Sequence, residues 1–186
     1  MSDKIVYLMR GLPSCGKSHT AKILAGETGV ICETDEYFYT QVGEDPTQFD
    51  YQDDLLETAR QWNFERFCRA VEEGRSPIVV DRGNSLSIES QQYARFAVDR
   101  GYRVELAEPK SDWWQEIRVL LKHKKYTLPV LKEWAAKLSK MNRQTHRVSA
   151  EQIFRWMEKW RWEVTIEDIL NYRPSPAATT NNSRAA

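Results

Sequence analysis

The chain has 186 residues, enough for one domain that buries a core of its own. Hydrophobic residues make up 41 % and charged residues 29 %, with only eight glycines and seven prolines, which excludes collagen-like, intrinsically disordered and membrane-embedded proteins. Lysine plus arginine equals aspartate plus glutamate at 27 each, so net charge alone favours neither an anionic nor a cationic partner.

The charges are unevenly distributed along the chain. Residues 35–57 hold eight carboxylates and no lysine or arginine, whereas residues 110–161 hold thirteen lysines and arginines against five carboxylates. This asymmetry fits a polyanionic ligand on the basic side, and it fits solvated helix surfaces equally well.

Cysteine usage and the N-terminal residues predict a cytoplasmic protein. The three cysteines are few and odd in number, the apolar run at residues 5–9 is too short for a secretory signal, and no run is long enough to span a membrane. We therefore expect free thiols and no membrane partner. No histidine pairs with a cysteine at metal-ligand spacing, so no zinc site is expected from His19, His123 or His146.

Short apolar runs alternate with helical periodicity in the first 110 residues, which predicts an α/β fold with a parallel sheet flanked by helices. The expected strands are residues 4–9, 29–32, 76–81 and 102–107. The expected helices are residues 17–25, 51–73 and 88–100.

The C-terminal part has a different character. Residues 110–162 show helical periodicity but no clear strand, which predicts two or three helices, the last one opened by a capping box of Ser149 and Gln152. Residues 164–169 fit either a helix or a short strand. Residues 174–186 contain no large apolar side chain, so we expect a single domain over residues 1–173 followed by a loose tail.

A phosphate-binding loop lies between the first expected strand and the first expected helix. The segment from Gly11 to Ser18 matches the pattern G-x-x-x-x-G-K-S, whose glycines allow backbone amides to point at phosphate oxygens. Lys17 is expected at the β- and γ-phosphates of ATP, and the Ser18 hydroxyl at Mg²⁺. The expected nucleotide contacts are Gly11, Ser14, Cys15, Gly16, Lys17, Ser18 and His19.

Phosphoryl transfer also needs carboxylates near the phosphates. Asp81 ends the third expected strand and lies at the carboxyl edge of the sheet, where it can assist the metal or anchor an arginine. Asp35 follows the second strand by the same logic, which makes it a candidate general base toward an acceptor hydroxyl. The alternative for Asp35 is a structural one, the N-cap of a short helix.

Several segments together resemble the polynucleotide 5′-kinase branch of the P-loop kinases, which includes small ATP-binding proteins labelled AAA-type. The resemblance covers about residues 4–170 and rests on Gly11 to Ser18, Thr34 to Phe38, Ala59 to Asn63, Gly74 to Asp81, Asn84, Gly101 to Glu105, Glu108-Pro109 and Trp113-Trp114. It implies a P-loop kinase fold with a C-terminal helical lid at about residues 110–162. It also implies ATP binding by the phosphate-binding loop, with Asp35 as the base and lid arginines closing on the phosphates.

The chain departs from that family at several places. Tyr37 and Phe38 stand where phage-type enzymes carry an arginine that helps to hold the 3′-phosphate of the substrate. Many relatives have the motif Asp-x-Thr-Asn after the third strand, whereas this chain has Arg82 and a glycine between Asp81 and Asn84. We expect Arg82 either to contact the substrate or to pair with the acidic segment 35–57. The lid arginine is Arg143 or Arg147, with Arg147 preferred, and residues 117–138 look like an added helical segment that covers the acceptor.

Tryptophans recur at helical spacing in the basic region. Ile153, Trp156 and Trp160 follow this spacing, and interleaved bases and aromatics can stack with exposed nucleobases. Packing against a helical core is the favoured interpretation, because aromatic residues at this period normally face inward. Cys15 lies at a helix N-terminus, where the pKa of a thiol can fall, so oxidative inhibition through Cys15 is a further hypothesis.

Taken together, the sequence predicts a kinase that uses ATP and Mg²⁺ and transfers the γ-phosphoryl group to a hydroxyl. The favoured acceptor is the 5′-OH of a polynucleotide. Lys17, Asp35 and a lid arginine are the expected catalytic residues. Asp35, Asp81 and Arg82 are expected at the acceptor, with Ser18 and Asp81 at the metal. Two alternatives remain open: a kinase for a small hydroxyl acceptor such as a nucleoside, sugar or antibiotic, and an ATP-binding switch that transfers to nothing.

Overall fold

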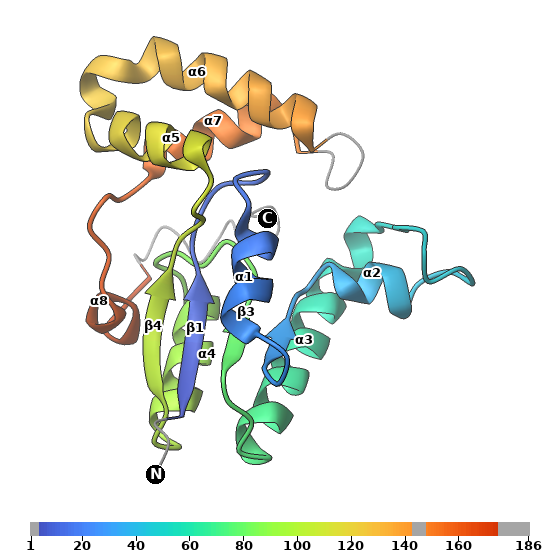
Figure 1. Ribbon diagram of the computed structural model, residues 1–186. Helices are drawn as coiled ribbons and strands as arrows, with labels where there is room; N and C mark the ends of the chain where they lie inside the picture. Colours follow the sequence, from blue (N-terminus) through green and yellow to red (C-terminus); the bar gives the residue numbers. More distant parts are fainter. Residues whose placement is uncertain (1–3, 143–147, 175–186) are drawn as a thin grey trace.

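The computed structural model describes residues 4–142 and 148–174, which form a four-stranded parallel sheet, its flanking helices and a group of helices above it (Figure 1). The strands are β1 (Ile5–Met9), β2 (Val30–Cys32), β3 (Ile78–Val80) and β4 (Arg103–Ala107). The helices are α1 (Lys17–Ala25), α2 (Glu36–Thr40), α3 (Leu56–Glu72), α4 (Ile88–Val98), α5 (Asp112–Lys122), α6 (Lys124–Met141), α7 (Ala150–Lys159) and α8 (Ile166–Leu170), with a 3-10 turn at Asp53–Leu55.

The strands run in the order β2-β3-β1-β4, and all pairs are parallel. Val6 of β1 lies opposite Ile78 of β3 and Val104 of β4, so β1 is in the interior of the sheet. This is the expected α/β architecture, and it is that of a P-loop kinase fold. Because parallel strands end at one edge, the loops after β1, β2 and β3 come together there.

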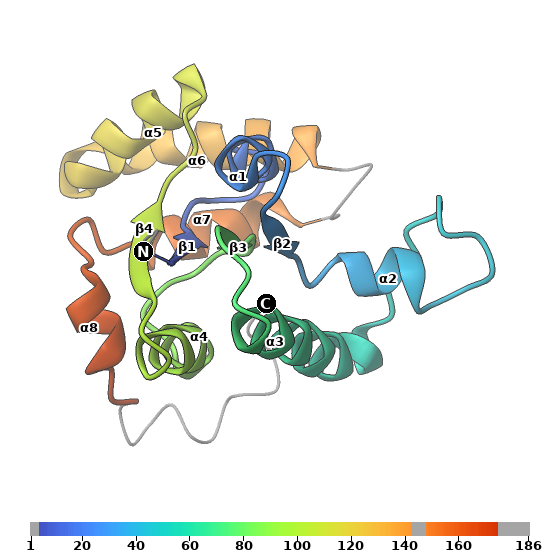
Figure 2. The same ribbon diagram turned by 60° about the horizontal axis from the view of Figure 1, so that its bottom comes forward.

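Both faces of the sheet are covered, because successive side chains of a strand point to opposite faces. On one face α1 packs on Met9 and Val79, and on the other α3 and α4 pack on Val6, Leu8 and Val80 (Figure 2). The strands therefore read as continuous apolar runs, as strands buried on both faces do.

Helices α5, α6 and α7 form a helical subdomain above the carboxyl ends of the strands (Figure 1). Its core contains the fully buried Trp114, with Ile117, Leu131 and Ile153 around it. Two or three helices were expected over residues 110–162, and the described part of that range holds three. Trp156 and Trp160 pack against the same core, as the preferred interpretation of the tryptophan spacing predicted.

Several boundaries differ from the expected ones. The helix predicted from residue 51 begins at Leu56, because Gln52 is extended and a 3-10 turn comes first. Residues 166–170 are helical, and Thr165 opens this helix with a capping box that includes Asp168. At α7, Ser149 accepts from the Gln152 amide, which is one of the two bonds expected of its capping box.

Candidate active site

The phosphate-binding loop joins β1 to α1 in the conformation that its sequence pattern requires. Ser14 and Gly16 are both in the left-handed region, with φ values of 58° and 88°. Gly16 is the N-cap of α1, and among the described residues no side chain caps this helix end. The first turn of α1 therefore presents backbone amides and the positive end of the helix dipole, which suits phosphate.

The segment after β4 holds this loop in place. Trp113 Nε1 donates to the Ser14 carbonyl at 3.0 Å, and Ser111 Oγ donates to the Cys15 carbonyl at 2.8 Å. A Cβ on Gly11 would lie 2.9 Å from two ring carbons of Pro109, so only glycine allows this approach. Ser111 and Trp113 were not among the predicted site residues, although Trp113 stands in one of the segments that carry the family resemblance and both residues follow the end of β4 within six positions.

Two loop side chains point away from the phosphate side and into the helical subdomain. Leu12 and Cys15 are buried in the core around Trp114. Cys15 can therefore offer a nucleotide only its backbone. Burial raises the pKa of the Cys15 thiol to about 12, although the Lys17 charge opposes this. The hypothesis of a reactive Cys15 thiol is wrong, because loss of hydration outweighs the helix N-terminus.

Lys17 lies at the centre of the site. Its Nζ donates to the Leu12 carbonyl at 2.8 Å, inside the loop. Burial lowers the pKa of Lys17, and the charges of Cys15, Asp81, Asp35 and Glu33 oppose that shift. Both carboxylates that the sequence singled out thus lie within electrostatic reach of the ammonium group. Glu33 is a third one that sequence reasoning missed, although it directly follows β2.

Asp81 follows β3 and is almost fully buried. Its backbone amide donates to the Cys32 carbonyl at 2.9 Å, which continues the pairing of β3 with β2. Nearby, Asn84 Nδ2 donates to the Met9 carbonyl at 2.8 Å and to the Val80 carbonyl at 3.1 Å. This side chain ties the ends of β1 and β3 together, and so places Asp81 beside the phosphate-binding loop.

Asp35 occupies the N-cap position of α2, but its side chain makes no capping hydrogen bond. The alternative prediction, that Asp35 is the N-cap of a short helix, is therefore correct for its position in the backbone. The side chain does not make the hydrogen bond that a capping residue would make. The next residue, Glu36, pairs with Arg66 of α3 at 2.6 Å. Phe38 is fully buried against α3, and the Tyr37 ring packs edge-on against Trp62 at 5.5 Å. These aromatics make α2 part of a core.

Arg82 pairs with Glu89 in the first turn of α4, at 2.6 Å. Glu89 lies outside the acidic segment 35–57, so this salt bridge is not the predicted pairing of Arg82 with that segment.

The other predicted loop residues, Ser18 and His19, are exposed at the start of α1. The two candidate lid arginines, Arg143 and Arg147, lie outside the described residues.

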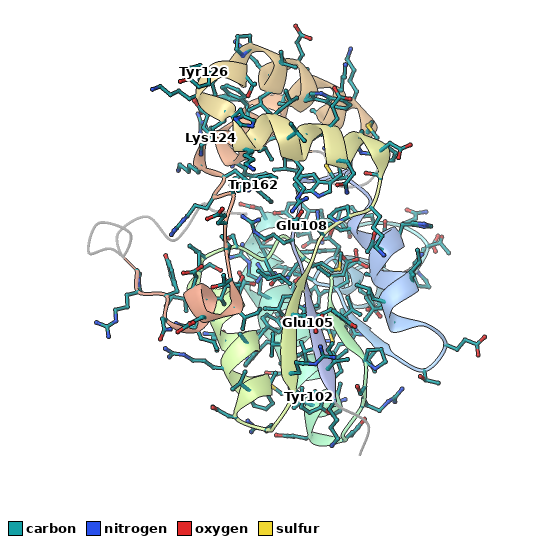
Figure 3. All side chains as sticks on the ribbon, turned by 60° about the vertical axis from the view of Figure 1, so that its left-hand side comes forward. Tyr102, Glu105, Glu108, Lys124, Tyr126 and Trp162 are labelled. Carbon is teal, nitrogen blue, oxygen red and sulfur yellow. The ribbon has the colours of Figure 1, made fainter. Side chains whose placement is uncertain are left out.

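A charged cluster connects the sheet to the helical subdomain behind the loop. Arg10 is buried, its Nη1 lies 3.4 Å from Glu108 Oε1, and its guanidinium lies 4.0 Å from the centre of the Trp160 ring. Burial lowers the pKa of Arg10, against the charge of Glu108. Figure 3 shows Glu108 and Trp162 at this junction, where they help to line a cavity of about 600 Å³.

The oxygen ligands available at the site are suitable for Mg²⁺ bound together with a nucleotide. The Ser18 hydroxyl and the Asp81 carboxylate are oxygen ligands of the kind that Mg²⁺ prefers, and this ion takes few protein ligands beside substrate phosphates. Within residues 4–142 and 148–174, no group of three or more His, Cys, Asp or Glu side chains is placed so that it could hold a metal ion by itself. In the same residues, no helix has the length and apolar character needed to cross a membrane.

Comparisons with known proteins agree with this geometry. The model of a protein family described as an AAA domain matches residues 6–127. Human NEDD4-binding protein 2 is 32 % identical over 169 residues, which are 90 % of this chain and 8 % of that protein. Human YLP motif-containing protein 1 is 30 % identical over 131 residues, 59 % of this chain and 6 % of that protein. The chain thus spans less than a tenth of the length of these two relatives.

The family match covers the phosphate-binding loop, α2 and the strand ends that carry Asp35 and Asp81. The strand order and the geometry of the loop are those of a nucleotide-binding P-loop fold. The chain therefore belongs to the AAA domain family and has a P-loop kinase-type domain.

Proposed function

We propose that this protein is a phosphotransferase that moves the γ-phosphoryl group of Mg²⁺-ATP to the 5′-hydroxyl of a polynucleotide. The observation that carries the proposal is the convergence of Asp35 and Asp81 on Lys17, at the carboxyl edge of the sheet. A site that only binds nucleotide has no need of a second carboxylate beyond the metal position. Asp35 follows β2, on the far side of β3 from β1, and in this proposal its carboxylate serves the acceptor.

Each residue has a separate part in this proposal. The loop amides and Lys17 bind the phosphates, and Ser18 and Asp81 would hold Mg²⁺. When bound, Mg²⁺ neutralises charge on the β- and γ-phosphates. Asp35 accepts the proton of the acceptor hydroxyl. Arg143 or Arg147 is proposed to stabilise the equatorial oxygens of the transferred group.

The atoms balance without a further reactant. The acceptor oxygen forms a bond to the γ-phosphorus while the bond from that phosphorus to the β–γ bridging oxygen breaks. ADP leaves with the electron pair, and the hydroxyl proton goes to Asp35 and then to solvent. General-base assistance of this kind contributes roughly 10²- to 10⁴-fold to the rate.

The test combines wild-type protein, γ-labelled ATP, Mg²⁺ and RNA and DNA oligonucleotides that carry a 5′-hydroxyl. We expect label at the 5′ end, and a loss of at least roughly 10²-fold in the transfer rate for Asp35→Asn with nearly unchanged ATP affinity. Asp99→Asn is the matched control, because Asp99 ends α4 and is exposed. It should behave as wild type.

Three other results would contradict the proposal. Full transfer activity in Asp35→Asn would remove this carboxylate from the mechanism. Label on a nucleoside, sugar or antibiotic but on no oligonucleotide would make the protein a small-molecule kinase. ATP binding without label on any acceptor would point to a nucleotide-dependent switch.

A further inference from the structure

Helix α6 has an outer side that the described elements leave open. Its inner side packs on α5 and α7 through Leu131, Ala135 and Leu138, which are buried in the core of the helical subdomain. Tyr126 is 80 % exposed, and Figure 3 shows its side chain at the outside of the helix. The outer side of α6 is therefore available to a partner.

This outer side is basic. Helix α6 contains five lysines and a single carboxylate, Glu133. Lys124 is engaged inward, because its Nζ donates to the carbonyls of Glu158 and Trp160, both at 2.6 Å. Among the described residues no salt bridge involves any lysine of α6. The four lysines left for a partner are all exposed: Lys125, Lys132, Lys137 and Lys140.

The exposed side chains of α6 form two parallel rows. Lys125, Lys132 and Lys140 recur at intervals of seven and eight residues, or about two turns, and so form a basic row along the helix. An apolar row of exposed side chains lies beside it, made up of Tyr126, Val130 and Met141. Lys125 Nζ lies 5.7 Å from the centre of the Tyr126 ring, so the rows are in contact at this end. The two rows together are the α6 surface.

The two rows match the chemistry of a single nucleic-acid strand. Such a strand carries evenly spaced negative phosphates along one side and stackable bases along the other. The basic row extends over fifteen residues, or about 22 Å at 1.5 Å per residue. A strand with a rise of about 3.4 Å per nucleotide covers this length with about six nucleotides. An acidic peptide would match the basic row alone.

The position of α6 leads from this surface to the candidate active site. Helix α6 runs from the side of β4 toward the side of α2 and ends at Met141, above the carboxyl ends of the strands (Figure 1 and Figure 2). Asp35 lies on the same side of the molecule, between β2 and α2. A strand whose 5′ end is at Asp35 can therefore reach the C-terminal end of α6 first and continue toward Lys125.

The path on the other side of Asp35 is acidic. Residues 36–57 contain seven carboxylates and no lysine or arginine. Most of these side chains are exposed, as those of Glu44, Asp45, Asp53 and Asp54 are. A strand that ran over α2 and the following loop would be repelled at each phosphate. The charges of the two sides thus favour a path over α6.

We propose that the α6 surface binds the acceptor strand beyond its 5′ end, with phosphates on the basic row and bases on the apolar row. The inference rests on the proposed function and names the part of the protein that distinguishes a polynucleotide from a single nucleotide. Lysines bind phosphates as point charges and stacking accepts any base, so this recognition does not depend on the base sequence.

The first test measures strand binding without ATP, so it does not depend on transfer. The probe is a ten-residue single-stranded DNA with a 5′-hydroxyl and a fluorophore at its 3′ end, and anisotropy gives the Kd. The lysine variant combines Lys125→Gln, Lys132→Gln and Lys140→Gln. We expect its Kd to rise at least roughly 10-fold. The slope of log Kd against log salt concentration should fall by about 2, or about 0.7 for each lost phosphate contact.

The matched control removes the same charge from the opposite edge of the sheet. This arginine variant replaces three exposed residues by glutamine, namely Arg69 at the end of α3, Arg100 after α4 and Arg103 at the start of β4. It should keep the Kd and the salt slope of the wild-type protein within about 2-fold. Equal Kd values and slopes in the two variants, with equal thermal unfolding, would overturn the inference. So would an equally tight complex with a glutamate peptide of the same charge as the strand, because general attraction between charges would then explain the binding.

The second test concerns the apolar row. Tyr126→Ala should raise the Kd for the same strand roughly 5-fold, because a base loses its stacking partner. Tyr126→Phe is the control, since it keeps the ring, and its Kd should equal that of the wild-type protein. Equal Kd values in Tyr126→Ala and Tyr126→Phe would contradict the placement of bases on this row.

The third test separates this inference from the proposed function. With γ-labelled ATP and Mg²⁺, the ratio of kcat/KM for the ten-residue strand to that for a dinucleotide should fall toward one in the lysine variant. Label at the 5′ end with an unchanged ratio would contradict the inference and leave the proposed function in place. A strand that binds the α6 surface but receives no label, with no label on any other acceptor, would instead remove the proposed function.

Discussion

Trp113 Nε1 donates a hydrogen bond of 3.0 Å to the carbonyl of Ser14, the residue that takes the left-handed conformation in the phosphate-binding loop. This bond connects α5 directly to the loop. Leu12 and Cys15 reinforce the connection, because their side chains are buried in the core of the helical subdomain. The phosphate-binding loop is thus packed between the sheet and the helical subdomain, and its shape depends on both.

Trp113→Phe should weaken nucleotide binding, because the ring remains while the bond to Ser14 is lost. A hydrogen bond of this kind is worth about 1 kcal/mol, which corresponds to roughly a 5-fold rise in the Kd for ATP. Titration calorimetry measures this directly. Trp134→Phe is the matched control, since it removes a tryptophan bond to Glu116 on the surface of the same subdomain. Equal Kd values in the two variants would show that the bond does not shape the loop.

Gly11→Ala should lower nucleotide affinity by at least roughly 10-fold and the free energy of unfolding by about 1–3 kcal/mol, because the new Cβ would lie 2.9 Å from the Pro109 ring. Gly83→Ala is the comparison, with its nearest contact at 3.8 Å. It should change the free energy of unfolding by less than about 0.5 kcal/mol. Urea unfolding and ATP titration of both variants test this. A harmless Gly11→Ala would mean that the loop and Pro109 move apart easily.

Asn84→Ala should destabilise the fold, because two buried carbonyls at the ends of β1 and β3 would lose a donor. The expected loss is about 2 kcal/mol, or roughly 4–8 °C in Tm for a domain of this size. Differential scanning calorimetry gives the value. Asn171→Ala, which removes an exposed bond to the Glu167 carbonyl, should shift Tm far less. Similar Tm shifts in the two variants would argue that the Asn84 side chain does not stabilise the fold by linking the ends of β1 and β3.

The buried cysteines make stability depend on pH above neutrality. Burial raises the pKa of both Cys15 and Cys32 to about 12, whereas an unfolded thiol ionises near about 8.5. Between these values the unfolded state loses protons that the folded state keeps, so the free energy of unfolding falls as pH rises. The loss is about 2 kcal/mol for each thiol at pH ~10.

Urea unfolding at about pH 8 and pH 10 tests this coupling. The double variant Cys15→Ala, Cys32→Ala should lose about 4 kcal/mol less than wild type between the two values, because other titrating groups contribute equally to both proteins. A pH dependence that is the same in both proteins would show that the thiols ionise normally in the folded state.

Local patterns in the sequence were enough to predict the strands, the helices beside them and the phosphate-binding loop. Apolar runs of five or six residues between helical segments leave few arrangements other than a parallel sheet, and the spacing from Gly11 to Ser18 has few uses apart from phosphate. Strand ends also predicted that Asp35 and Asp81 would lie near Lys17, because parallel strands finish at one edge. These features depend on residues that are neighbours in the chain or on the direction of the strands.

Local patterns did not reveal which groups act on one another across elements, because those contacts depend on how the chain folds. The pairing of Arg82 with Glu89, the bond from Trp113 to Ser14 and the burial of Cys15 each join segments that no local pattern connects. The prediction for Cys15 failed for that reason. A helix N-terminus is a local feature that lowers the pKa of a thiol, whereas the apolar side chains that exclude water from Cys15 come from α5 and its neighbours, and loss of hydration is the larger effect.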